Sequence, residues 1–386
     1  MWSKQNNPQR TYRRALDYPV TLQGGSLVRL SPNNKKMIKD NLCKGLFLLA
    51  LAMFSTSSFG ADTAYDGGQP TNPKDLKGKK IVLADVPKLI GIGYFAATAK
   101  GIAEGCADLT KNGLPTEVTT DAPTEGDIQK QVEFIDNAIS RGVDGIFFAA
   151  NDPVAISPVL RKALKAGIHV IGYDAESQPD AREWFLQMAT PDGIAKALID
   201  SLVAEVGPDA DIALVTSSLT AAGQNAWIAE IKKYMPVAYP KLNLVTILPA
   251  EEDQQLAFKV TGQILKAYPK VKGIIGLSSV AFPGAADAIT QANLGGKIAV
   301  VGLSTPNQMK PFVKSGVVKS VILWNPVDLG YASAYAMRAA VDGKLKPGDT
   351  ELDAGRLGKL KVIHGSQILL GPPTVFTKDN IDKYDF

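Results

Sequence analysis

The feature that most constrains this fold is an alternation of short apolar runs with longer amphipathic segments from Lys80 onward. The runs lack the polar alternation of a half-exposed strand, so we predict strands that are buried on both faces. They cover 80–86, 117–122, 145–150, 169–175, 211–218, 244–248, 273–279, 298–304 and 318–325. Buried strands that alternate with helices form parallel sheets with helices on both faces. The chain is therefore predicted to be an α/β protein.

The segments between the runs carry the helical period and divide the chain into two sets. Apolar residues recur on one helical face at positions 128, 132, 135 and 139, and again at 256, 260, 264 and 267. A polar break at 176–180 separates the first four runs from the rest. Because 386 residues are enough for two cores, we predict two doubly wound parallel-sheet lobes. After Pro347 we expect only short extended pieces, at 359–363 and 374–376.

The N-terminal region has the three-part layout of a secretory signal peptide. Four lysines precede a ten-residue apolar run at 45–54, and small residues follow the run up to Gly60. The run is too short to span a bilayer comfortably, and we expect cleavage next to Gly60. The predicted segments are a non-native or disordered extension (1–36), a signal peptide whose Met37 starts translation (37–60), and a polar leader (61–78).

The charge distribution and the two cysteines bear on nucleic-acid partners, membrane insertion and disulfide bonds. The formal net charge is +4, but residues 1–60 hold nine of the 42 basic residues and two of the 38 acidic residues. The remaining chain is slightly acidic, so we expect no nucleic-acid partner and no stable membrane insertion after signal cleavage. Cys43 precedes the apolar run and Cys106 lies on an apolar stripe, so we predict no disulfide in the mature protein.

Catalytic and cofactor sites find little support in the sequence. The only two histidines, His169 and His364, are not placed to serve as bases beside a nucleophile, and the few His and Cys residues lack the spacing of zinc ligands. Residues 91–96 match a dinucleotide GxGxxA pattern, but four residues separate the match from the strand, and two aromatics would crowd a pyrophosphate. We therefore predict no catalytic residue, metal or cofactor. A nucleotide-cofactor-dependent enzyme is kept as the alternative of another class.

Polar side chains follow many of the predicted strands at their carboxyl ends, where open parallel sheets bind ligands. They are Lys88, Asn151, Asp152, Asp174, Ser278, Ser279, Ser304, Thr305 and Asn325, with the aromatic Trp324 among them. Each one alone is typical of a helix cap or a turn. Together with Tyr94 and Phe95 they would line one cleft between two lobes and hold a small polar ligand. Since no matched acid–base pair is present, we predict binding and no catalysis.

Several long motifs resemble one family, the periplasmic sugar-binding proteins of bacterial ABC importers, of the ribose-binding-like type. Within it the sequence is most similar to the branch of rhamnose-binding and autoinducer-2-binding receptors. The motifs are VPKLIGIGYF (86–95), AANDPVAISPVLRKALKAGIHVIGYDAE (149–176), GQNAWIAEIKK (223–233), GLSTPNQMKPFVKSG (302–316), WNPVDLGY (324–331) and NIDKYDF (380–386).

The resemblance implies a type I periplasmic binding protein with two lobes joined by a three-segment hinge. We then expect an N-terminal lobe of 79–176 plus about 325–348, and a C-terminal lobe and tail of 177–324 plus about 349–386. It also implies a periplasmic monomer that serves a permease with a separate ATPase. The expected ligand-binding residues are Lys88, Tyr94, Phe95, Asn151, Asp174, Gln224, Asn225, Ser278, Ser279, Trp324 and Asn325.

The expected ligand depends on positions at which this sequence differs from autoinducer-2 receptors. Autoinducer-2 receptors resemble the chain at Lys88, Asp174 and Gln224, but they carry Asp where this sequence has Gly223. They also carry Pro-Asp-Ala where this sequence has 277–279, Leu-Ser-Ser. We therefore favour a monosaccharide, such as a rhamnose-like deoxyhexose, with an autoinducer-2 receptor as the alternative. A transcription regulator of the same fold would need a helix-turn-helix in place of the signal peptide.

Overall fold

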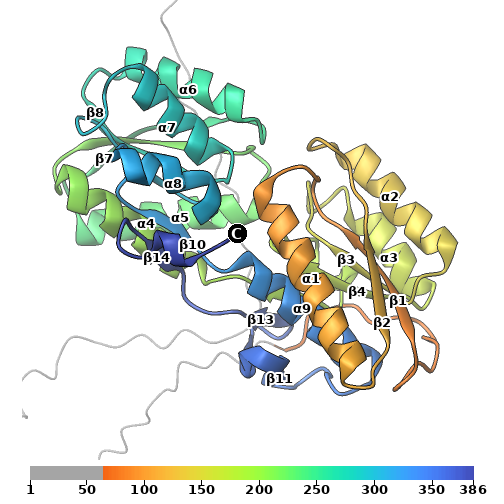
Figure 1. The fold of residues 1–386 in the computed structure, drawn as a ribbon. Helices are drawn as coiled ribbons and strands as arrows, with labels where there is room; N and C mark the ends of the chain where they lie inside the picture. Colours follow the sequence, from red (N-terminus) through yellow and green to blue (C-terminus); the bar gives the residue numbers. More distant parts are fainter. Residues whose placement is uncertain (1–63) are drawn as a thin grey trace, which may run out of the picture. The chain divides into compact units, whose positions relative to one another are not determined.

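The computed structural model describes residues 64–386, which lie within a single compact unit, 60–386 (Figure 1). The predicted extension (1–36), the signal peptide (37–60) with its cleavage site and Cys43 lie outside the described residues. Within 64–386, no helix is both long enough and apolar enough to cross a membrane.

The first lobe is built on an eight-stranded sheet. Its strands, in spatial order, are β11 (Glu351–Asp353), β12 (Lys359–Ile363), β13 (Gln367–Leu369), β5 (Trp184–Gln187), β4 (His169–Tyr173), β3 (Gly145–Phe148), β1 (Ile81–Val86) and β2 (Thr116–Thr120). Its helices are α1 (Gly93–Lys111), α2 (Ile128–Arg141), α3 (Ser157–Lys165) and α9 (Pro326–Val341). Pairing is parallel from β2 to β13, and β12 and β11 continue the sheet in the antiparallel sense.

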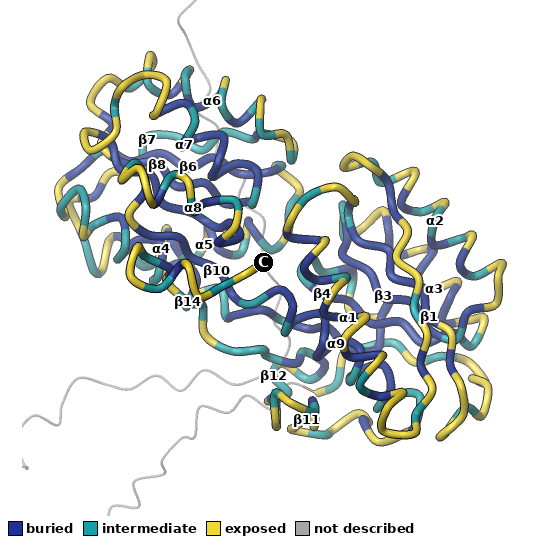
Figure 2. The backbone as a smooth tube through the Cα atoms, viewed as in Figure 1, coloured by how far each residue is buried: buried dark blue, intermediate teal, exposed yellow. Residues whose placement is uncertain are grey.

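Alternate residues of the first-lobe strands enter two separate apolar cores. In β3, Phe147 packs in the core that includes α1 and α9, whereas Ile146 and Phe148 pack in the core that includes α2 and α3. All three side chains are fully buried. Figure 2 shows these central strands as buried and the outer turns of the covering helices as exposed. Burial on both faces explains why the runs in the sequence lack polar alternation.

The second lobe is built on a parallel four-stranded sheet in the order β7 (Asn243–Pro249), β6 (Asp211–Thr216), β8 (Val271–Gly276) and β9 (Ala299–Gly302). A bridge from Leu303 to Ile322 adds β10 (Val321–Leu323), which pairs antiparallel with β14 (Thr374–Phe376). Its helices are α4 (Pro191–Val206), α5 (Ala222–Ala238), α6 (Gln254–Ala267), α7 (Ala281–Gln291) and α8 (Pro306–Ser315).

The predicted α/β class with two parallel-sheet lobes is confirmed, and each predicted run overlaps a strand. The lobe boundaries differ from the prediction, because β5 and β11–β13 join the first sheet although 177–324 and 349–386 were assigned to the second lobe. Strand β5 was not predicted, because it directly follows two charged residues, Arg182 and Glu183. Both are buried: Arg182 pairs with Glu176, and Glu183 contacts the His169 ring.

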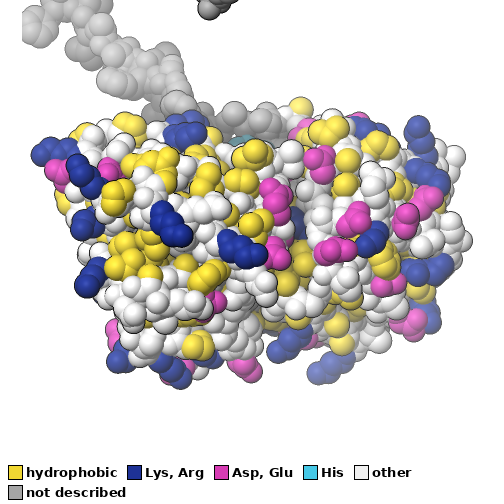
Figure 3. Space-filling view, turned by 90° about the horizontal axis from the view of Figure 1, so that it is seen from above, with side chains coloured by type: hydrophobic (Ala, Val, Ile, Leu, Met, Phe, Trp, Pro, Cys, Tyr) yellow, Lys and Arg dark blue, Asp and Glu magenta, His cyan; other side chains and the backbone are white. Residues whose placement is uncertain are grey.

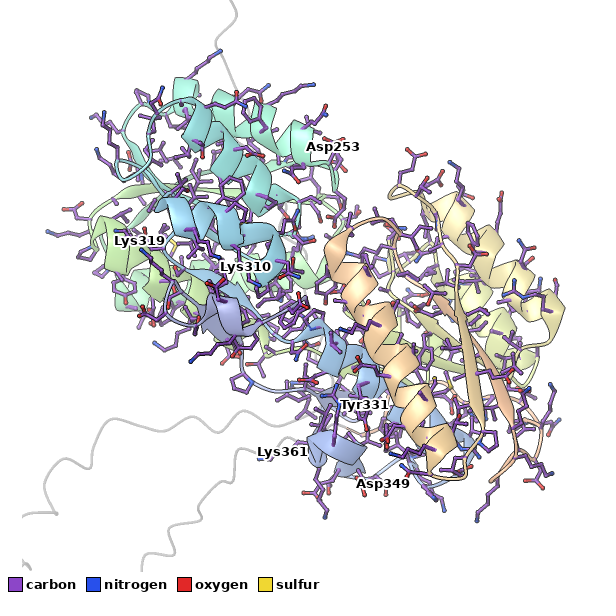
Figure 4. All side chains as sticks on the ribbon, in the orientation of Figure 1. Asp253, Lys310, Lys319, Tyr331, Asp349 and Lys361 are labelled. Carbon is purple, nitrogen blue, oxygen red and sulfur yellow. The ribbon has the colours of Figure 1, made fainter. Side chains whose placement is uncertain are left out.

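Three chain segments connect the two sheets, at 188–190, 324–325 and 370–373. The middle segment runs from β10 of the second sheet into α9, which packs beside α1 on the first sheet (Figure 1). In Figure 4, Tyr331 is labelled on α9, and its hydroxyl donates a hydrogen bond of 2.5 Å to Asp108 of α1. The leader from residue 64 onward also packs on the first lobe, where the Gly68 N–H donates to the Arg182 carbonyl at 2.8 Å.

The buried carboxyl of Asp85 leads us to expect an unusual pH dependence of the free energy of unfolding. This β1 carboxyl is fully buried and accepts hydrogen bonds from Tyr173 (2.9 Å) and Thr120 (3.0 Å). Burial raises the pKa of Asp85 to about 7, and the two hydrogen bonds offset part of that shift. An unfolded aspartate has a pKa of about 3.9, so the folded state holds the proton more tightly. The Asp85 contribution to stability is therefore greatest below pH 4 and is lost as the pH rises to about 7.

Urea unfolding between pH 4 and pH 8 measures this contribution. We expect the free energy of unfolding of the wild type to fall by on the order of 1–4 kcal/mol relative to the Asp85→Asn variant over this range. Asn mimics the protonated carboxyl and does not titrate. Parallel pH profiles for the two proteins would contradict the assignment.

Candidate functional site

A cavity of about 690 Å³, part of it open to solvent, lies where the strand ends of both lobes meet. Its first-lobe lining is Lys88, Ile92, Tyr94, Phe95, Ala150, Asn151, Pro153, Asp174, Ala175 and Glu176. Its second-lobe and connecting-segment lining is Ala221, Ala222, Gly223, Gln224, Trp227, Glu252, Leu277, Ser278, Ser279, Leu303, Leu323 and Trp324.

Gln131 of α2 joins the carboxyl ends of β1 and β3, which are followed by the cavity residues Lys88 and Asn151. Its fully buried amide donates to the Pro87 carbonyl (3.1 Å) and the Ala149 carbonyl (2.8 Å). The same side chain accepts a hydrogen bond from the Asn151 N–H at 3.0 Å. In turn the Asn151 side chain donates to the Lys88 carbonyl at 2.9 Å. The loops after β1 and β3 are thus tied together, and Asn151 serves the positioning of Lys88.

Asp174 is held by groups from the first lobe and the connecting segment. The Tyr94 hydroxyl donates to Asp174 Oδ1 at 2.8 Å, and Trp324 Nε1 donates to the same hydroxyl at 2.9 Å. Burial raises the pKa of Asp174, while Lys88 and the Tyr94 hydrogen bond act in the opposite direction and Glu252 adds to the rise. The backbone of Asp174 has φ +61°, in the left-handed region that Asp tolerates better than most residues.

Lys88 lies between two carboxylates without a hydrogen bond to either. Its Nζ is 4.0 Å from Asp174 Oδ2 in the first lobe and 3.7 Å from Glu252 Oε1 in the second. Both separations exceed the usual hydrogen-bond range, so the ammonium donors remain available to an oxygen placed between these groups.

The second lobe contributes one amide, two serines and an apolar wall. Gln224 Oε1 accepts hydrogen bonds from the Thr216 hydroxyl (2.5 Å) and the Ser217 N–H (2.7 Å), which directs the amide into the cavity lining. Ser278 Oγ accepts a hydrogen bond of 3.0 Å from the N–H of Ala281, the first residue of α7. Buried leucines 277, 303 and 323 supply the apolar part.

Aromatic rings cover another part of the cavity. Trp324 packs against Tyr94 and Trp227, with ring centroids 6.1 Å apart in both pairs. Phe95 lies 5.2 Å from Tyr94 in an edge-to-face arrangement. The lining therefore combines hydrogen-bonding groups with flat apolar faces, as small-ligand sites commonly do.

Nine of the eleven predicted ligand-binding residues line the cavity, and Asn225 and Asn325 do not. Asn225 is exposed on α5, where its amide donates to the Leu219 carbonyl at 2.9 Å. Asn325 caps α9 by accepting from the Val327 N–H at 2.9 Å. Both side chains thus have local structural roles, as cap and turn residues commonly do.

Among the charged and aromatic residues that line the cavity, three were not predicted from the sequence: Glu176, Trp227 and Glu252. Glu252 follows β7, an edge strand of the second sheet, and no residue after this strand was among the predicted site residues. Trp227 lies three residues after Gln224 on α5, a spacing that places both on one helical face.

The two histidines and Cys106 lie outside the cavity lining. His169 is buried against Glu183, at 2.9 Å from Nδ1 to Oε2. Cys106 is buried on α1, which raises the pKa of its thiol to about 12. Residues 91–96 match the dinucleotide-binding GxGxxA pattern, and two of them, Tyr94 and Phe95, form part of the cavity wall.

Residues 84–345 match the family described as periplasmic binding protein domain. The chain belongs to this family. Its curated relatives include the D-allose-binding periplasmic protein of Escherichia coli (25% identical, covering 69% of this chain and 86% of the relative). Another is the D-ribose/D-allose-binding protein of Pseudomonas aeruginosa (27% identical, covering 77% and 88%). The predicted family is thus confirmed.

Two solved structures extend the comparison. An ABC transporter solute-binding protein of Clostridium phytofermentas with bound L-rhamnose is 30% identical, with a TM-score of 0.73 and coverage of 79% of this chain and 98% of that chain. LsrB of Clostridium saccharobutylicum in complex with AI-2 is 25% identical, with a TM-score of 0.74 and coverage of 79% and 100%. The chain is similar to sugar-binding proteins of ABC transporters and, in fold, to proteins with different bound ligands.

Replacing Tyr94 by Phe tests the hydrogen-bond relay from Trp324 to Asp174. The variant leaves two buried polar groups without their shared partner, so we expect a loss of about 1–3 kcal/mol in the free energy of unfolding. Tyr384→Phe is the matched control, because no hydrogen bond of its hydroxyl is found in the described structure. Denaturant unfolding measures both variants, and equal stabilities would contradict the relay.

Proposed function

We propose that the protein is the periplasmic solute-binding component of a sugar ABC importer. It binds a monosaccharide in the cavity between its lobes and delivers the sugar to a permease, whose separate ATPase drives import. In this proposal the protein is a monomer without catalytic turnover or a cofactor, and it reaches the periplasm through the signal peptide at 37–60. Membership of the family and the sugar-binding relatives support this proposal.

The observation that carries the proposal is the pairing of polar groups with aromatic faces around one cavity. Lys88 and Asp174 offer a donor and an acceptor to neighbouring hydroxyls, and the Gln224 amide adds a donor from the other lobe. Trp227 and Trp324 offer flat faces to the C–H face of a sugar ring. A sugar ring can use both kinds of surface, because its hydroxyls form hydrogen bonds and its C–H face packs on aromatic rings.

The apolar wall favours a deoxyhexose over a fully hydroxylated sugar. A hydroxyl placed against Leu277, Leu303 or Leu323 would lose its hydrogen bonds to water, whereas a methyl group would gain by burial. A rhamnose-like sugar carries such a methyl group. Bound L-rhamnose in the similar structure from Clostridium phytofermentas is consistent with this choice.

Binding is coupled to closure in this proposal. The ligand contacts both lobes only when they are closed, so it shifts the population from open to closed. The three connecting segments at 188–190, 324–325 and 370–373 would act as the hinge. Trp324 lies in the second segment and also lines the cavity, so one residue of the hinge would contact the ligand directly.

Calorimetry with rhamnose, other aldoses, polyols and autoinducer-2 tests the function. We expect a monosaccharide to bind tightest, and Lys88→Met and Asp174→Asn to weaken it by about tenfold or more, since hydrogen bonds to charged groups contribute about 1.5–3 kcal/mol. Asn retains the left-handed backbone of Asp174. Asn225→Ala is the control, because this exposed residue does not line the cavity. Binding of NAD or ATP with no response to any sugar would overturn the proposal.

Gly223 provides a test of the choice between a monosaccharide and autoinducer-2. A Cβ at this position would meet open space, and residue 223 lies in the first turn of α5, where an acid is tolerated. We expect Gly223→Asp to raise the affinity for autoinducer-2 relative to rhamnose, measured by competition. If the wild type already prefers autoinducer-2 to every sugar, the monosaccharide assignment is wrong.

A further inference from the structure

Glu252 is a cavity residue whose side chain is directed inward by an unusual loop. Glu251 and Glu252 have φ values of +47° and +55°, a conformation that non-glycine residues rarely adopt in succession. The loop is anchored by the Ala250 N–H, which donates to the Thr216 carbonyl at 2.8 Å. Asp253, labelled in Figure 4, ends the loop and caps α6 by accepting from the Leu256 N–H at 2.6 Å. Only 16% of the Glu252 side chain is exposed.

The charges that line the cavity do not balance. Four charged residues line it: Lys88, Asp174, Glu176 and Glu252. Glu176 is neutralised by fully buried Arg182, whose Nη2 lies 3.0 Å from its Oε2. Lys88 then faces two carboxyl groups, one from each lobe, so the cavity carries one excess negative charge when both are ionised.

A second hollow adjoins the cavity and shares Ile92 and Glu252 with it. Its charged lining consists of acids alone: Glu125, Asp127, Glu251, Glu252 and Asp253. Figure 3 shows acidic side chains gathered around the middle of one face of the molecule. Lys130 pairs with Glu125 at 3.0 Å and with Asp127 at 3.7 Å, whereas Glu251 and Asp253 form no ion pair among the described residues. A charged ligand that passes Glu251 and Asp253 therefore meets negative charge before it reaches Lys88.

We infer that Glu252 is a specificity-determining residue that makes the cavity select neutral sugars and reject sugar acids. This inference rests on the proposed function and names the ligand class of the same site. An anionic group near Lys88 gains one attraction but meets two carboxylates at similar distances, so repulsion prevails in a site with little solvent. Neutral hydroxyls avoid this repulsion and can use Lys88 as donor and both acids as acceptors. Specificity of this kind comes from a repulsive element.

The test compares Glu252→Gln with Glu251→Gln. The control removes the same charge from the neighbouring residue, which lines the hollow but not the cavity. Calorimetric competition measures a neutral aldose, its uronate and its 2-amino-2-deoxy derivative. In Glu252→Gln we expect the uronate to gain about tenfold relative to the neutral sugar, and the cationic amino sugar to lose a similar factor. Opposite shifts cannot come from a general loss of structure. If Glu252→Gln does not fold, Glu252→Ser makes the same change of charge.

Each outcome of this comparison decides the inference. Unchanged ratios in Glu252→Gln, or equal shifts in Glu251→Gln, overturn it while the proposed function stands, provided that the wild type binds the neutral sugar. A wild type that binds no sugar at all overturns the proposed function and the inference with it.

Discussion

The cavity depends on a buried ionic arrangement around Asp174. This carboxylate accepts from Tyr94, which accepts from Trp324 in the connecting segment, so one chain of hydrogen bonds joins the first lobe to the hinge. Lys88 lies near Asp174 without closing a hydrogen bond. A buried acid with an incomplete set of partners is costly unless a further group completes it. A ligand hydroxyl placed between Lys88 and Asp174 would supply that group, which links stability of the closed site to occupancy.

The fold places these groups by simple geometry. Parallel strands end at the same edge of a sheet, and the polar residues after β1, β3 and β4 therefore meet. Gln131 then reduces their freedom by tying the ends of β1 and β3 together. The second lobe repeats this logic with Gln224, Ser278 and Glu252. Two sheets that each bring polar groups to one edge can thus form a site that neither forms alone.

The strands that could be predicted from the sequence are those whose buried residues are apolar. Elements next to buried charged residues could not be predicted in this way. Uninterrupted apolar runs located the central strands, and polar strand ends located Lys88, Asn151 and Asp174. β5 was missed because buried Arg182 and Glu183 precede it, and their burial depends on partners distant in the chain, such as Ser366. Asn225 was assigned to the site through resemblance, but its side chain faces solvent. Glu252 could not be assigned to the site from sequence periodicity, because its role depends on Lys88, its partner in the other lobe.

The most direct test of the central claim is a crystal structure of residues 64–386 grown with L-rhamnose. The account predicts a sugar in the cavity, with an oxygen within hydrogen-bond distance of Lys88 Nζ and a carboxylate of Asp174 or Glu252, and with a ring face against Trp227 or Trp324. A sugar bound elsewhere, or an empty cavity at saturating rhamnose and at saturating concentrations of other aldoses, would contradict it.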